Sequence, residues 1–244
     1  MRYLIKFSYD GTNFYGYQKQ PNKRTVEGEL EKALYDINNH TDTRIYSSGR
    51  TDRGVHANGQ TAHFDLDISI TLYKLKCALN SLLPDDIHVI EAIDIEDDFH
   101  ARFMAKKKTY KYYLNMGEYN PVERNSIHQY NKELDVDKMK EAIKDFIGTY
   151  NFKIFASREV IKESYVRDIY DANIETSGDI VIFTFTGSGF MKYQVRNMVG
   201  TLMKIGKGKL EVNTIKKLLN NELTDKYVFT AKPEGLYLVE VSYK

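Results

Sequence analysis

The sequence predicts an α+β fold made of two similar halves, each a mainly antiparallel sheet with helices on one face. Strand and helix patterns do not alternate regularly along the chain, which disfavours a doubly wound parallel sheet. The second half repeats the kinds of element found in the first. With 244 residues, of which 42% are hydrophobic, the chain is long enough to bury a core in one large domain or two small ones.

The first half opens with a strand pattern over residues 2–9. Thr25 is an expected N-cap for a helix whose apolar residues recur at helical spacing from Val26 to Ile37. A second helix carries leucines at helical spacing and ends before Pro84. Alternating or apolar runs predict the remaining strands of this half at residues 60–66, 87–95 and 109–114.

The second half begins with a helix over residues 136–147 that Gly148 stops. Two strands follow and are joined through a turn at residues 177–179. The predicted elements are strands at 166–174 and 180–186, helices at 195–205 and 214–219, and a terminal strand at 236–243. Residues 117–131 are the expected linker, which gives an N-terminal half over 1–116 and a C-terminal half over 132–244.

Charge is unevenly distributed, although the formal net charge is only +1. Residues 101–111 and 187–210 each carry several lysines or arginines and no acidic residue, whereas acidic residues gather in 85–98. A bipolar chain of this kind can present a basic surface to phosphate groups. Each lysine run taken singly is equally consistent with a solvated helix or strand face.

The single cysteine, Cys77, excludes internal disulfides and lies in an apolar helical pattern, so we expect it to be a small core residue. No apolar run reaches membrane-spanning length, and the sequence starts directly with a strand pattern rather than the core of a signal peptide. We therefore expect a soluble, cytoplasmic protein.

The segment most suggestive of chemistry is residues 49–56, which read GRTDRGVH. The glycines at both ends predict a tight exposed loop, and the strand that follows can hold it rigidly. Arg50 and Arg53 flank Asp52, and nearby guanidinium groups keep a carboxylate ionised and therefore nucleophilic. The alternative is an ordinary Asx turn or surface ion pair, and spacing alone does not exclude it.

No cofactor or metal site is indicated by the sequence. It contains neither a glycine-rich phosphate loop of the P-loop spacing nor a cysteine cluster. His56 and His63 are seven residues apart, but a third ligand at a characteristic spacing is missing, so we do not expect them to bind a metal.

Several ordered blocks of sequence resemble the tRNA pseudouridine synthase A (TruA) family across almost the whole chain. They are YDGT with FYGYQ at 9–18, GRTDRGVH at 49–56, FHARF at 99–103, KTYKY at 108–112, QVRNMVG at 194–200 and AKPEGLYL at 231–238. The resemblance implies the two-halved fold with its sheets joined across a basic cleft. It also implies a homodimer that isomerises uridine in the tRNA anticodon stem-loop, at positions 38, 39 or 40, without a cofactor.

The same resemblance implies roles for individual residues. Asp52 would be the nucleophile, and Arg196 would be its ion-pair partner. Tyr110 would stack on the target uracil, Leu236 would line the apolar wall of the pocket, and Arg50 would fill the space that the base leaves. Independently of the resemblance, the positive charges of Arg53, Lys106, Lys107 and Lys108 are expected to contact RNA phosphates. Without the resemblance, Tyr110 would be read as a core aromatic residue and Arg196 as a surface or phosphate-binding arginine.

Two positions depart from the family pattern. Tyr17 stands where tryptophan is common, which preserves a packing or stacking role, and Arg53 stands where a small residue is common. Two other functions remain as alternatives. A non-catalytic tRNA-binding or chaperone protein would use the same basic cleft without needing Asp52. A glycoside or nucleoside hydrolase would need a second carboxylate that acts as the general acid, and none is evident in the matched blocks.

Overall fold

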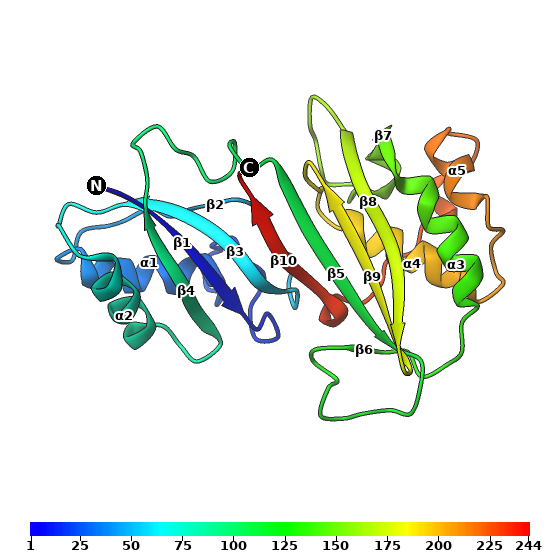
Figure 1. The fold of residues 1–244 in the computed structure, drawn as a ribbon, viewed down its shortest axis with the longest axis horizontal. Coiled ribbons are helices and arrows are strands. Elements are labelled where there is room, and N and C mark those ends of the chain that lie inside the picture. Colours follow the sequence, from blue (N-terminus) through cyan, green and yellow to red (C-terminus); the bar gives the residue numbers. More distant parts are fainter. The chain divides into compact units, whose positions relative to one another are not determined.

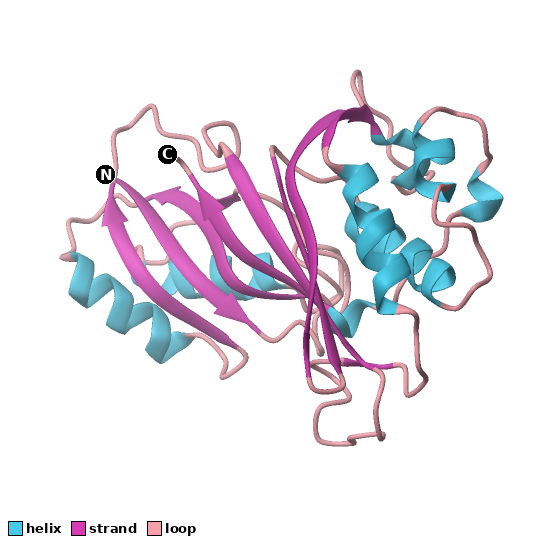
Figure 2. Cartoon of the chain, turned by 45° about the vertical axis from the view of Figure 1, so that its right-hand side comes forward, coloured by secondary structure: helices cyan, strands magenta, loops and turns pink.

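The computed structural model describes residues 1–244, which form two compact units (Figure 1). Unit 1 comprises Met1–Lys106 together with Leu238–Lys244, and unit 2 comprises Lys107–Tyr237. The terminal strand β10, Leu236–Ser242, therefore begins in unit 2 and ends in unit 1. In each unit the helices lie on one side of the strands (Figure 2), as the α+β prediction requires.

The sheet of unit 1 is antiparallel and has β1 at its centre. β1 (Arg2–Tyr9) pairs with β3 (His56–Asp65) on one side and with β4 (Ile87–Asp94) on the other. The short strand β2 (Tyr46–Ser47) pairs with β3. The register between β1 and β3 shifts between Phe7 and Tyr9, at the end of β3 that follows the GRTDRGVH loop.

The two helices of unit 1 match their predictions. Thr25 caps α1 (Val26–Ile37) by accepting a hydrogen bond from the backbone N–H of Gly28 at 3.3 Å, and α2 (Leu72–Leu82) is capped in the same way by Thr71. The prediction for Cys77 was wrong. Its side chain is exposed on α2, because Leu75 and Leu79 supply the buried face of that helix.

The sheet of unit 2 has the strand order β5, β9, β8, β7, and all these pairs are antiparallel. These strands are β5 (Lys107–Asn115), β7 (Gly148–Asn151), β8 (Val166–Ser177) and β9 (Ile180–Gly187). A short strand, β6 (His128–Gln129), runs parallel to β5. Gly178 takes a φ of +58° in the tight turn from β8 to β9, which fits the predicted hairpin.

The helices of unit 2 are α3 (Val136–Ala142), α4 (Gln194–Gly206) and α5 (Thr214–Leu219). Most of α4 is buried, including Val195, Met198 and Val199. Four short 3-10 turns complete the unit: Ile143–Phe146, Phe152–Phe155, Asp225–Tyr227 and Pro233–Gly235. None of the helices in either unit combines the length and apolar character needed to cross a membrane.

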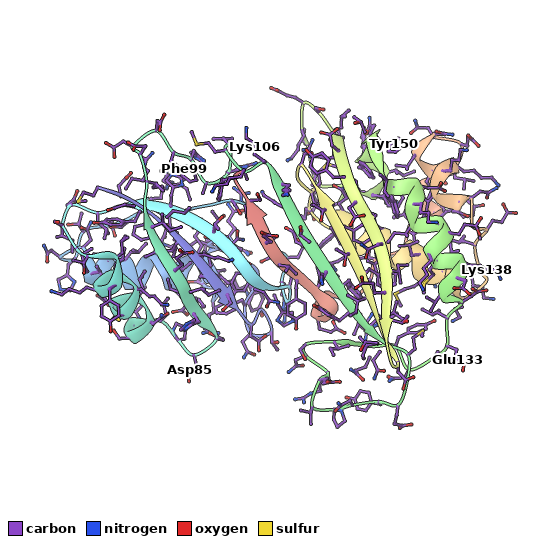
Figure 3. All side chains as sticks on the ribbon, viewed as in Figure 1. Asp85, Phe99, Lys106, Glu133, Lys138 and Tyr150 are labelled. Atoms are coloured by element: carbon purple, nitrogen blue, oxygen red, sulfur yellow. The ribbon has the colours of Figure 1, made fainter.

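Two predicted boundaries in this part of the chain differ from the structure. The helix expected over 136–147 is α-helical only to Ala142 and tightens into a 3-10 turn before Gly148, whose φ is +129°. Residues 117–131, expected to form a linker, lie inside unit 2, and Gln129 accepts a hydrogen bond from the side chain of Asn115 at 2.9 Å. The compact units divide instead after Lys106, at the end of the long loop that also carries Phe99 (Figure 3).

Candidate active site

Asp52 lies at the tip of a turn whose backbone is fixed from both sides. The Asp52 carbonyl accepts a hydrogen bond from the N–H of Val55 at 3.1 Å, and Gly54 takes a φ of +75° to close the turn. The carbonyl of the preceding residue, Thr51, accepts from the N–H of Tyr17 at 3.1 Å. Asp52 itself is half-buried while Thr51 and Val55 are buried, so the loop backbone is anchored on both sides of Asp52.

Two glycines outside the loop allow neighbouring backbone to approach it closely. A Cβ on Gly11 would overlap the carbonyl group of Val55. Gly16 takes a φ of +93°, and a Cβ there would lie 3.0 Å from the carbonyl oxygen of Thr51. The YDGT and FYGYQ blocks therefore support the Asp52 loop through the absence of side chains, which explains why glycines are needed at these two places.

The other end of the loop is held by buried side chains. The Gln60 amide donates to the carbonyl of Gly49 at 2.9 Å, and its oxygen accepts from the Ser48 hydroxyl at 2.7 Å. The hydroxyl groups of Tyr9 and Thr51 are 2.8 Å apart. Burial raises the pKa of the Tyr9 hydroxyl above its usual value of 10.0, so this group stays neutral and available for hydrogen bonding.

Tyr17, the first departure from the family pattern, has a packing role. Its side chain is 1% exposed, and its ring centroid lies 6.5 Å from that of Tyr9. Burial raises the pKa of the Tyr17 hydroxyl well above the usual range. A large aromatic residue therefore fills this space beneath the loop, as the sequence predicts.

Arg50 and Arg53 do not flank the carboxylate as a pair of ionic partners. Both side chains are exposed, and neither forms a salt bridge with Asp52. The Arg53 guanidinium lies instead over the ring of Tyr15, 4.3 Å from its centroid. Arg53 is therefore oriented by the aromatic ring and not by a salt bridge to the Asp52 carboxylate.

His56 and His63 occupy different environments. The Nδ1 atom of His56 accepts from the N–H of Gly11 at 3.1 Å, and that of His63 accepts from the N–H of Ala101 at 3.2 Å. His63 stacks on Tyr46 at 5.1 Å and contacts His100 edge-on at 4.7 Å. Burial and the neighbouring positive charges lower the pKa of His63 from 6.5 to about 4. Both histidines are thus engaged as acceptors in the packing of unit 1.

In unit 2, Tyr110 lies in the middle of β5 and is 7% exposed. Its ring meets Phe190 edge-to-face with centroids 5.2 Å apart. Phe190 comes from the loop between β9 and α4, so the GF pair at 189–190 supports the position of the tyrosine. Sequence reasoning placed Tyr110 on a strand but did not find Phe190 as its packing partner.

Arg196 lies in the first turn of α4 and is bound to the segment before β10. Its Nε donates to the carbonyl of Ala231 at 2.9 Å, while the N–H of Ala231 donates to the Arg196 carbonyl at 2.9 Å. The guanidinium lies 4.9 Å from the ring centroid of Tyr193, which takes a φ of +65° before the helix begins. Side chain and backbone of Arg196 are thus both tied within unit 2.

The segment that ends at Leu236 is held by a second buried pair. The Tyr112 hydroxyl donates to the carbonyl of Lys232 at 2.9 Å and lies 2.7 Å from Nδ1 of His128. A phenol has one proton, so its oxygen accepts from the His128 ring. Burial, with a contribution from the Lys232 charge, lowers the pKa of His128 from 6.5 to about 4, and the ring is neutral at pH 7. Leu236 is 5% exposed.

The three predicted phosphate-binding lysines differ in exposure. Lys106 and Lys107 are exposed, whereas Lys108 is 9% exposed, because successive residues of a strand point to opposite faces. Of the predicted site residues, Arg50, Asp52 and Arg53 belong to unit 1, and Tyr110, Arg196 and Leu236 belong to unit 2. Tyr9, Tyr112 and His128 were not predicted, since contacts between distant parts of the sequence leave no local signal.

Comparisons with known proteins agree with this arrangement. A family model described as tRNA pseudouridine synthase matches residues 5–104 and 142–244. The chain is 44% identical to tRNA pseudouridine synthase A of Streptococcus agalactiae serotype Ia, over 100% of this chain and 95% of the relative. It is 43% identical to the protein of the same name from Streptococcus mutans serotype c, over 100% and 99% of the two chains. It is also 43% identical to tRNA pseudouridine synthase A of Anoxybacillus flavithermus, over 99% of this chain and 98% of the relative.

The chain belongs to the tRNA pseudouridine synthase family. Enzymes of this family convert uridine into pseudouridine, so the chain is an isomerase. The family assignment predicted from the sequence blocks is confirmed by the family model and by relatives that match the whole chain.

Proposed function

We propose that this protein isomerises uridine in the anticodon stem-loop of tRNA, at positions 38, 39 or 40, with Asp52 as nucleophile and without a cofactor. The observation that carries the proposal is the GRTDRGVH loop. Its backbone is fixed by Tyr17, Val55 and Gln60, and Asp52 is half-buried in it. A rigid loop that presents one carboxylate suits a nucleophile, because little ordering is needed when the substrate binds.

The reaction needs one nucleophile, and the ribose C1′ atom exchanges its bond to uracil N1 for a bond to uracil C5. Asp52 attacks C1′ of the ribose, and the bond from C1′ to uracil N1 breaks with its electron pair on the base. The uracil turns so that C5 attacks C1′ and displaces the carboxylate. The proton on C5 then leaves, and N1 takes up a proton from solvent. Uridine and pseudouridine contain the same atoms, so the reaction needs no oxidant, reductant or group donor.

Three further residues have roles in this proposal. Tyr110 stacks on the uracil and takes the C5 proton, Arg196 pairs with Asp52, and Leu236 lines the apolar wall. The rigid settings of these side chains in unit 2 support such roles, since each is packed or hydrogen-bonded before any substrate arrives. The half-buried Arg196 would orient the carboxylate and keep it ionised.

The target base must leave its stack before the carboxylate can reach it, at a cost of about a few kcal/mol. Arg50 would occupy the vacated space. Phosphate contacts from Arg53, Lys106 and Lys107 would offset part of this cost, with Lys108 contributing least because it is buried. We further propose that the enzyme acts in the cytoplasm as a homodimer in which tRNA contacts both subunits.

Tritium release tests this function. Purified protein is incubated with tRNA transcripts that carry tritium at uracil C5, because isomerisation transfers that label to water. We expect release from the anticodon stem-loop uridines in the presence of a chelator. Asp52→Asn should abolish release and leave tRNA affinity nearly unchanged, because the amide keeps the shape but is not a nucleophile.

Three results would count against the proposal. Loss of activity on chelation would show that a metal is required. An Asp52→Asn variant within about tenfold of the wild-type rate, equivalent to about 1.4 kcal/mol of barrier, would exclude the carboxylate as nucleophile. A wild-type protein that binds tRNA and releases no tritium would instead be a non-catalytic tRNA-binding protein.

A further inference from the structure

We infer that Tyr15, Lys23 and Arg53 form a phosphate-binding subsite beside the Asp52 loop, which holds the RNA backbone close to the target nucleotide. The inference rests on the proposed function, since it assumes that RNA is bound at the loop. It goes beyond that function by placing the phosphate contact of Arg53 in a defined site with Tyr15 and Lys23.

The aromatic ring of Tyr15 makes cation–π contacts with two side chains. The Arg53 guanidinium carbon lies 4.3 Å from the ring centroid, and the Lys23 ammonium nitrogen lies 4.5 Å from it. The ring is 39% exposed, and both cationic side chains are exposed. Cation–π contact orients a guanidinium through its flat face and leaves its N–H groups free to donate at the edge. The two charges are close enough to contact one phosphate or two successive phosphates of one strand.

Neither Lys23 nor Arg53 forms a salt bridge with a carboxylate, whereas the nearby cations Arg24 and Lys19 do. Arg24, the residue next to Lys23, is bound by Asp86 at 2.7 Å and by Glu29 at 3.1 Å. Lys19 pairs with Glu31 at 2.6 Å. Lys23 and Arg53 have no such partner, although two like charges on one ring repel each other. An arrangement that holds two cations together without a counter-charge is suited to an anionic ligand.

The position of this cluster relative to Asp52 is fixed by the backbone. The N–H of Tyr15 donates to the carbonyl of Arg24 at 2.9 Å, and the Gln20 side chain donates to the carbonyl of Tyr15 at 2.9 Å. Gly16, directly after Tyr15, packs against the loop backbone at Thr51 and Arg53. A phosphate held on Tyr15 is therefore at a set distance from the carboxylate.

This fixed distance gives the subsite a role in choosing the substrate nucleotide. RNA contacts of this kind position the strand without reading its sequence. A phosphate anchored beside Asp52 sets which nucleotide of the strand reaches the carboxylate. We therefore assign to the cluster the role of setting the register of the RNA strand, and we assign it no role in the chemical reaction.

The test measures binding of an anticodon stem-loop RNA at several salt concentrations. We expect Arg53→Ala and Lys23→Ala each to weaken binding by about threefold to tenfold and to reduce the slope of log affinity against log salt by about 0.7 to 0.9. Lys19→Ala is the matched control, because it removes an equal charge that is already paired, and it should change affinity by less than about twofold. Tyr15→Leu should weaken binding although it removes no charge, and Tyr15→Phe should restore most of the loss, since it keeps the ring.

A second measurement locates the phosphate. Neutral methylphosphonate linkages are placed one at a time around the target uridine. We expect one linkage, or two adjacent ones, to weaken binding by wild-type protein and to have little further effect on Arg53→Ala. The inference is overturned if Arg53→Ala behaves like Lys19→Ala, if Tyr15→Leu binds as wild type does, or if no linkage is coupled to Arg53. Tritium release by the wild-type protein is scored separately, so a failure of the proposed function is distinguished from a failure of the subsite.

Discussion

The Asp52 loop of unit 1 and the segment of unit 2 that leads to Leu236 are both irregular, and both combine close backbone approach with side-chain hydrogen bonds. In the loop, Gly11 and Gly16 permit the close approach, and the Gln60 side chain binds the carbonyl of Gly49. In the segment, a Cβ on Gly235 would lie 2.6 Å from the carbonyl oxygen of Tyr113, and Arg196 and Tyr112 bind the carbonyl groups of Ala231 and Lys232. The difference is one of degree: the loop relies more on close backbone approach, and the segment relies more on side-chain donors.

Gly11→Ala is expected to have the largest effect. The new Cβ would overlap the backbone carbonyl of Val55, which cannot move aside as a flexible side chain can. We expect a loss of about 3 kcal/mol or more in the free energy of unfolding, measured with urea, together with loss of tritium release. Gly178→Ala is the control, since its φ is +58° but nothing lies within 4 Å of the new atom, and it should cost about 1 kcal/mol. Equal effects for the two variants would remove the role given to close approach.

Arg196→Ala should come next, with an effect on chemistry larger than on binding. We expect the single-turnover rate at saturating enzyme to fall about 100-fold, equivalent to about 2.7 kcal/mol, because a misaligned Asp52 raises the barrier for bound tRNA. Arg196→Lys should not recover this rate, since lysine lacks the Nε donor that binds Ala231. If only the salt dependence of tRNA binding changes, Arg196 is a phosphate-binding residue and not the partner of Asp52.

Tyr112→Phe tests the hydrogen bond from the Tyr112 hydroxyl to the Lys232 carbonyl in the unit 2 segment. Removing the hydroxyl leaves the Lys232 carbonyl and the His128 ring without their buried partner, at a cost of about 2 kcal/mol in the free energy of unfolding. Tyr9→Phe is the matched change in unit 1, where the Gly11, Gly16 and Gln60 contacts remain, and it should cost about 1 kcal/mol. A larger loss for Tyr9→Phe would contradict the contrast between the two regions.

The effect that is smallest at neutral pH is a dependence of stability on pH that both units share. His63 and His128 have folded pKa values lowered from 6.5 to about 4, so the unfolded chain binds more protons between these values. The contribution of these two histidines to the free energy of unfolding is therefore fully present above about pH 6.5. It falls as the pH drops towards 4, and the loss is about 1 to 2 kcal/mol per histidine at pH 5. His128→Gln should flatten this dependence in urea unfolding followed between pH 4.5 and 7.5. An unchanged slope would show that His128 is not buried in its neutral form.

Local patterns in the sequence were enough to predict the regular elements and the loop that carries Asp52. The cap at Thr25, the hairpin glycine at 178 and the helix over 214–219 are all properties of neighbouring residues, so they can be read from short windows. Strand β6 and the tie between Tyr112 and His128 join residues far apart in the chain, and no short window contains them.

Side-chain direction was the harder part of the site. The prediction that two arginines surround the carboxylate followed from adjacency in sequence, but Arg53 turns to Tyr15, a residue nearly forty positions earlier. Lys108 was grouped with its neighbours for the same reason, although a strand sends alternate residues to opposite faces. Cys77 was assigned to the core because its helix is apolar, while only part of that helix is covered.

The exposed position of Cys77 has a practical consequence. It is the only cysteine of the chain, and it lies on α2, away from the Asp52 loop in sequence. A maleimide dye therefore attaches at one known place on the unaltered protein, and no native thiol has to be removed first. Energy transfer from that dye to a fluorophore on the end of an anticodon stem-loop would report arrival and departure of RNA in real time.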